Sequence, residues 1–64
     1  MINEQELNIA LAQEGKTKAD MAEYLGINRS TLSKKINGKT KFTLPELQKI
    51  SVLFGKDRMY SIFF

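Results

Sequence analysis

Four places in this sequence carry the side chains that begin an α-helix, and they fix most of what the chain can fold into. Asn3, Thr17, Asn28 and Thr43 each offer an oxygen that can accept a hydrogen bond from a backbone N–H of the first helical turn. The residue three positions after Asn3, Thr17 and Thr43 is acidic, as in a capping box. The sequence therefore predicts four short helices that start at these residues.

Each predicted helix also has a residue that ends it. Apolar residues inside the segments recur three and four positions apart, as Leu47, Ile50 and Phe54 do. No segment alternates polar and apolar residues over a useful length, so no strand is predicted. The predicted fold is all-α, a compact bundle of four to five short helices, in which the fifth would begin at Asp57. The residues expected to end the first four helices are Gly15, Gly26, Asn37-Gly38 and Gly55.

Length and composition exclude several classes of function. The 64 residues are interpreted as a single domain spanning 1–64. The chain has no cysteine and no histidine, and its acids are scattered without a nucleophile–base pair or a glycine-rich phosphate loop. We therefore expect no enzyme, no cofactor, no metal site and no small-molecule ligand. No apolar run approaches the ~20 residues that cross a bilayer and no signal peptide is visible, so a cytoplasmic protein without a membrane partner is expected.

The charge is distributed unevenly along the chain. The net charge is only +3, but no acidic residue lies between Tyr24 and Pro45. Five basic residues lie in that interval, and they are Arg29, Lys34, Lys35, Lys39 and Lys41. Such one-sided charge is typical of a nucleic-acid binder, although an inert solvated face can also carry it.

The second and third predicted helices are joined by a very short connection at Gly26. Such a connection fits two helices that cross steeply, and it also fits an ordinary helical hairpin. With Leu32 and Ile36 directed inward, Lys35 should be exposed. The residues left on the outer sector are short hydroxyls and long cations, which can contact bases and phosphates in a major groove. These residues are Arg29, Ser30, Ser33 and Lys34.

The stretch "KADMAEYLGINRSTLSKKINGK" resembles the helix-turn-helix of Cro and phage-repressor proteins, the XRE-like family. "FTLPELQKISVLFG" is similar to the fourth helix of the same family. This resemblance implies a lambda-repressor-like fold that binds double-stranded DNA, with the third helix in the major groove. It also implies a Cro- or repressor-like transcriptional regulator of phage or mobile-element origin. The matching positions are Ala22, Gly26, Ile27, Leu32 and Asn37-Gly38-Lys39.

The residue pattern and the resemblance together predict which residues contact DNA, and the backbone contact from Lys18 is an inference from this chain rather than a transfer from the family. The family usually has Thr-Gln where this chain has Thr17-Lys18, and an apolar residue then Glu where this chain has Lys35-Ile36. The expected base contacts are Asn28, Arg29, Ser30, Ser33 and Lys34. The expected phosphate contacts are Thr17, Lys18, Thr31, Lys35, Asn37, Lys39 and Lys41. One short helix spans too few base pairs to select a genomic site, so a homodimer on a palindromic operator is expected.

Two alternatives stay open from the sequence. The chain could be a protein-interaction module that binds another regulator through a modified helix-turn-helix. The apolar ending Ile62-Phe63-Phe64 could fold back on the core, which we expect, or form a dimer contact. Tyr24 is expected to be a half-buried packing residue. The other aromatic residues are expected in the core rather than as a base-stacking set, and they are Phe42, Phe54, Tyr60, Phe63 and Phe64.

Overall fold

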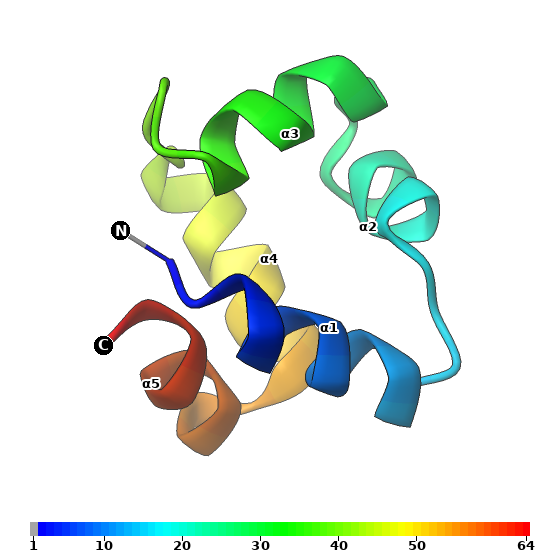
Figure 1. The fold of residues 1–64 in the computed structure, drawn as a ribbon, viewed down its shortest axis with the longest axis vertical. Helices are drawn as coiled ribbons and strands as arrows, with labels where there is room; N and C mark the ends of the chain where they lie inside the picture. The colour runs from blue at the N-terminus through cyan, green and yellow to red at the C-terminus, as the bar shows by residue number, and fades with distance from the viewer. Residues whose placement is uncertain (1) are drawn as a thin grey trace.

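The computed structural model describes residues 2–64, and these form five short α-helices without a strand (Figure 1). The all-α prediction is therefore confirmed for this part of the chain. The four capped helices begin where capping chemistry placed them, and the fifth begins one residue before Asp57. The helices are α1 (Glu4–Gln13), α2 (Lys18–Leu25), α3 (Arg29–Ile36), α4 (Leu44–Phe54) and α5 (Lys56–Phe63).

All four predicted N-cap side chains make their hydrogen bonds. The Asn3 and Asn28 Oδ1 atoms accept from the Glu6 and Thr31 backbone N–H groups at 3.1 and 2.7 Å. Thr17 and Thr43 form complete capping boxes at the starts of α2 and α4. Each bond satisfies a backbone donor that has no partner within its own helix, which is why these side chains set the helix starts.

Two glycines shape the short connections on either side of α3. Gly26 has φ +75° and Gly38 has φ +81°, a region that side chains with a Cβ rarely adopt. Beyond them the Ile27 N–H donates to the Ala22 carbonyl at 3.0 Å, and the Lys39 N–H donates to the Lys34 carbonyl at 2.8 Å. These turns satisfy helix-end carbonyls and reverse the chain sharply, so α3 is held between two tight bends.

The five helices surround one apolar core. α5 closes this core at the chain ends, where Ile62 is buried and its carbonyl accepts from the Asn3 N–H at 2.7 Å. The Phe63 ring packs edge-on against Phe42, with centroids 5.5 Å apart. The predicted fold-back is therefore confirmed for Ile62 and Phe63. The buried residues are Leu7, Ala10, Leu11, Met21, Ala22, Leu25, Leu32, Ile36, Ile50 and Ile62.

Two aromatic residues depart from the core prediction. Tyr60 is 70% exposed and Phe64 is 92% exposed, and their rings lie against each other with centroids 5.2 Å apart. They share one side of α5, and Ile62 lies on the side that the core covers. Tyr24 is 40% exposed, more than the half-buried position expected for it, although its hydroxyl packs back on α4 and donates to the Lys49 carbonyl at 3.0 Å.

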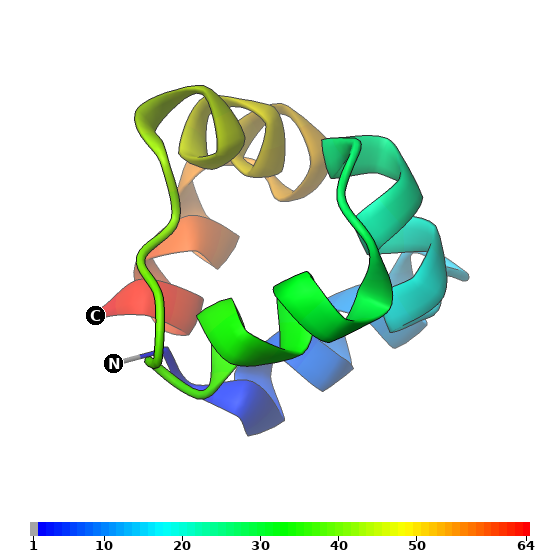
Figure 2. The same cartoon turned by 90° about the horizontal axis from the view of Figure 1, so that it is seen from above.

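α3 lies at the edge of the molecule and crosses α2 steeply (Figures 1 and 2). Ile36 is 5% exposed, which confirms the predicted inward side of this helix. The prediction that Lys35 is exposed is wrong, because its side chain is only 10% exposed. Its long stem turns towards α4, and the ammonium donates to the Glu46 carboxylate and to the Lys41 carbonyl in the preceding loop.

We expect Ile36→Ala to lower the free energy of unfolding by about 2–5 kcal/mol, because it leaves a cavity beneath α3. Val52→Ala is the matched control, since Val52 is an aliphatic residue that is 82% exposed. Its effect should stay within about 0.5 kcal/mol. Urea unfolding followed by circular dichroism measures both values. Equal losses in the two variants would contradict the inward assignment of Ile36.

Candidate nucleic-acid interface

The outer side of α3 is polar and basic along its whole length. Ser30, Ser33 and Lys34 are exposed, and Asn37 continues the same side beyond the last turn. Leu32 and Ile36 are buried on the opposite side and dock the helix on the core. The structure therefore brings the predicted base-contact residues to one accessible surface that carries neither an acidic nor an aliphatic side chain from α3.

Arg29 and Asn28 form the N-terminal end of this surface. Arg29 is exposed at the edge of a hollow of about 160 Å³, and Ser33 lines the same hollow. The Asn28 Oδ1 atom is occupied by its capping bond to the Thr31 N–H, so the Asn28 amide N–H₂ is the group that can donate outward. Thr31 is half-buried, at the edge of this surface.

The start of α2 meets the same hollow from the other side. The Lys18 ammonium lies 2.6 Å from a Glu4 carboxylate oxygen, and both side chains line the hollow with Arg29. Thr17 is exposed and caps α2, and its backbone N–H and its hydroxyl hold the pKa of Asp20 below the ordinary range. Glu4 was not expected at this site, because it lies fourteen residues from Lys18 and no spacing rule joins them.

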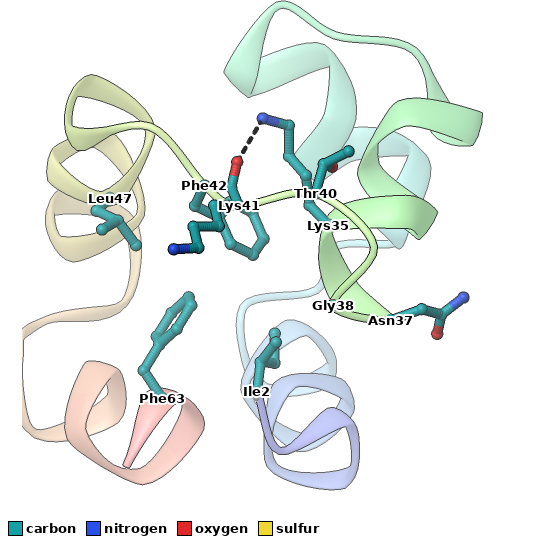
Figure 3. Close-up of a pocket in the computed structure, with 9 residues that line it drawn as sticks. All are labelled: Ile2, Lys35, Asn37, Gly38, Thr40, Lys41, Phe42, Leu47 and Phe63. Atoms are coloured by element: carbon teal, nitrogen blue, oxygen red, sulfur yellow. Dashed lines mark hydrogen bonds between the residues drawn. The ribbon is translucent and has the colours of Figure 1, made fainter.

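The loop that follows α3 carries further cations. Asn37, Lys39 and Lys41 are all exposed. Asn37 points away from a pocket of about 400 Å³ beside the loop, whereas the Lys41 ammonium lies over that pocket near Phe63 (Figure 3). Three of the predicted phosphate-contact residues therefore lie in one short segment, directly beyond the C-terminal end of α3.

Lys35 has a different environment from the other cations. Its ammonium lies 2.8 Å from a Glu46 carboxylate oxygen and donates to the Lys41 carbonyl at 3.1 Å, as Figure 3 shows for the carbonyl. The Glu46 side chain is 12% exposed, and the same oxygen accepts from the Thr43 N–H at 2.8 Å. Burial raises the pKa of Glu46, but the hydrogen bonds from Lys35 and Thr43 outweigh it, so this pKa is lowered overall.

Other kinds of site are not supported by the described residues. Within residues 2–64 no group of acidic side chains has the arrangement of a metal site. None of the helices in that range is both long enough and apolar enough to cross a bilayer.

We expect the Lys35–Glu46 pair to make the thermal stability of the protein fall when the pH drops low enough to protonate Glu46. Because the pKa of Glu46 is lowered on folding, its stabilisation is present above the ordinary glutamate pKa of about 4.3 and is lost as the pH falls towards the folded-state value. Glu46→Gln should therefore flatten the decline of melting temperature below about pH 4.3, and Lys35→Met should flatten it as well. Acid titration followed by thermal circular dichroism tests this. Curves parallel to that of the wild type would show that the pair contributes nothing.

A family model described as helix-turn-helix, HTH_3, matches residues 7–60. The match runs from the buried part of α1 into α5 and includes α2, α3 and the loop beyond them. Neither the curated proteins nor the solved structures give a significant match. The matched family consists of DNA-binding regulators and is not typically enzymatic. Since the match covers most of the chain, this protein belongs to the Cro/C1-type, XRE-like helix-turn-helix family.

Proposed function

We propose that this protein binds double-stranded DNA in a sequence-specific manner and regulates transcription, with α3 in the major groove. The observation that carries the proposal is the outer side of α3, which is accessible, polar and basic on a helix docked by Leu32 and Ile36. A side that packed against another helix would present apolar residues instead. We place its action in the cytoplasm and, from the family resemblance, assign it a Cro- or repressor-like role of phage or mobile-element origin.

The polar residues on and beside the outer side of α3 divide into two proposed roles. Arg29, Ser30, Ser33, Lys34 and the Asn28 amide read base edges, because arginine, lysine, amide and hydroxyl groups match major-groove donors and acceptors. The other residues contact phosphates, which fixes the register of α3 without reading sequence. These are Thr17, Lys18, Thr31, Asn37, Lys39 and Lys41. Lys35 is left out, since its ammonium is already bound to Glu46 and the Lys41 carbonyl.

Lys18 needs an exchange of partners to reach DNA. Its ammonium is paired with Glu4, and this pair is partly exposed, so the interaction is weak enough to be replaced by a phosphate. The Glu4 carboxylate would then face the backbone of the DNA beside Arg29. Repulsion between this carboxylate and the phosphates would be a cost of the exchange, which the new Lys18–phosphate contact offsets.

A homodimer on a palindromic operator completes the proposal. α3 has eight residues and reaches only a few base pairs, which cannot distinguish one site among about 10⁶ or more competitors. Two copies related by a two-fold axis would place their α3 helices about 34 Å apart in successive major grooves. Tyr60 and Phe64 offer an exposed aromatic pair for the contact between copies.

The same exposed aromatic pair also supports a second candidate function. A protein-interaction module would use Tyr60 and Phe64 to bind another regulator and would leave α3 without DNA. The two functions differ in their response to salt. Binding to DNA weakens steeply as salt rises, because bound counterions are released, whereas an apolar protein contact does not weaken in this way.

We expect selection from randomised duplexes to enrich a palindrome, and Arg29→Ala to weaken binding to it by about 1–3 kcal/mol per half-site. The loss should concentrate at one base pair, because a bidentate arginine contact distinguishes that pair from the others. Titration against single-base variants of the selected duplex measures this. A uniform loss on every variant would assign Arg29 to a phosphate, and one protein per duplex would contradict the dimer.

Lys39→Ala should weaken binding to the selected duplex and to unrelated DNA by similar factors. The plot of log K against log salt should become shallower by about one, since one phosphate contact is lost. Lys56→Ala is the matched control, because Lys56 is an exposed lysine at the start of α5, outside the proposed interface. A change of sequence preference with an unchanged slope would show that Lys39 reads bases.

A further inference from the structure

We propose that Lys35 and Glu46 are positioning residues that hold the basic loop after α3 in its DNA-binding conformation without touching DNA themselves. This inference rests on the proposed function for its DNA readouts. Two neighbouring lysines of α3 have opposite environments. Lys34 extends into solvent from α3, whereas the next residue, Lys35, turns inward and is 10% exposed.

Every partner of the Lys35 ammonium lies on the loop or at the start of α4. It donates to the Lys41 carbonyl at 3.1 Å and to Glu46 Oε1 at 2.8 Å, and it lies 5.9 Å from the centroid of the Phe42 ring. The lysine stem comes from the last turn of α3. One side chain therefore ties α3 to both the end of the loop that follows it and to α4.

Glu46 extends this connection to the far end of the loop. Its Oε1 atom accepts from Lys35 and from the Thr43 N–H at 2.8 Å, and its own N–H donates to the Thr43 hydroxyl at 3.3 Å. At the near end the Lys39 N–H is bonded to the Lys34 carbonyl at 2.8 Å. The loop is thus fixed at both ends by groups that α3 and α4 supply.

The segment held in this way carries Lys39 and Lys41, two of the proposed phosphate contacts. A charge-assisted hydrogen bond in a poorly solvated place fixes geometry more firmly than a surface pair does. Because the loop is already ordered before it binds, it loses less conformational entropy on binding, and the free-energy cost of binding is smaller. Loss of the pair should therefore weaken DNA binding even though neither partner reaches the phosphates.

Glu46→Gln separates this inference from simple electrostatics. Removal of a negative charge near DNA would by itself strengthen binding, whereas loss of loop order should weaken it. Glutamine keeps the capping box, because its side-chain oxygen can still accept from the Thr43 N–H, but its contact with the Lys35 ammonium loses the charge that strengthens it. Glu23→Gln is the matched control, since Glu23 is an exposed glutamate on α2 away from the loop.

The experiment measures binding of each variant to the selected duplex by fluorescence anisotropy, well below its melting temperature. We expect Glu46→Gln to bind at least about threefold more weakly and Lys35→Met about tenfold more weakly. Lys35→Arg should recover most of the loss, because arginine can donate to both Glu46 and the Lys41 carbonyl. Glu23→Gln should bind as tightly as wild type. Binding by Glu46→Gln that is unchanged or tighter than wild type overturns the inference.

Non-additivity identifies how Lys35 acts. If Lys35 positions the loop, Lys39→Ala should cost much less in a Lys35→Met background than in wild type. Additive losses, with the salt slope reduced by one for each substitution, would instead make Lys35 a phosphate contact and overturn the inference.

A readout without DNA keeps the inference separate from the proposed function. Amide hydrogen exchange should become faster at Lys39 and Thr40 in Lys35→Met. The buried Ile50 of α4 serves as the reference, because its amide exchanges only through global unfolding and so reports any change in the stability of the whole domain. Unchanged exchange in the loop would overturn the inference. Failure of the wild type to bind any duplex would refute the proposed function and would leave the exchange result as the test of loop positioning.

Discussion

Burial of one side of α3 is the interaction on which the rest of the structure depends. Leu32 and Ile36 are the two side chains that α3 gives to the core, and both are almost fully buried. With eight residues, α3 is too short to be stable as an isolated helix in water, so its tertiary contacts hold it together. Those contacts also decide which residues of α3 face outward, and hence what the helix can bind.

The turns, the N-cap and the core around α3 also hold this helix in place. Tight turns at Gly26 and Gly38 let the chain enter and leave the helix within a few residues, and Asn28 satisfies its first turn. The core that supports it is small and draws on all five helices, including α5, which binds back to Asn3. In a domain of this size a few kcal/mol separate the folded from the unfolded state, so each of these local features matters for the surface as a whole.

Charge on this molecule is organised by contact as much as by sequence position. Lys34 and Lys35 are neighbours in the chain, yet one ammonium is in solvent and the other is bound between Glu46 and the Lys41 carbonyl. Lys18 is held by Glu4 at the rim of the hollow beside Arg29. The basic side of the protein is therefore a set of distinct sites, in which some cations are exposed and others are bound to a carboxylate or a carbonyl.

The sequence by itself determined the starts of the first four helices and, to within about two residues, their ends, because capping and glycine turns are local interactions between residues a few positions apart. It also determined the inward side of α3, since Leu32 and Ile36 follow the helical period. Only the tertiary structure decided the partners of Lys35, the place of Glu4 beside Lys18, and the exposure of Tyr60 and Phe64. These depend on which helices meet, and partners that are eleven or fourteen positions apart in the sequence leave no periodic signal of such a contact.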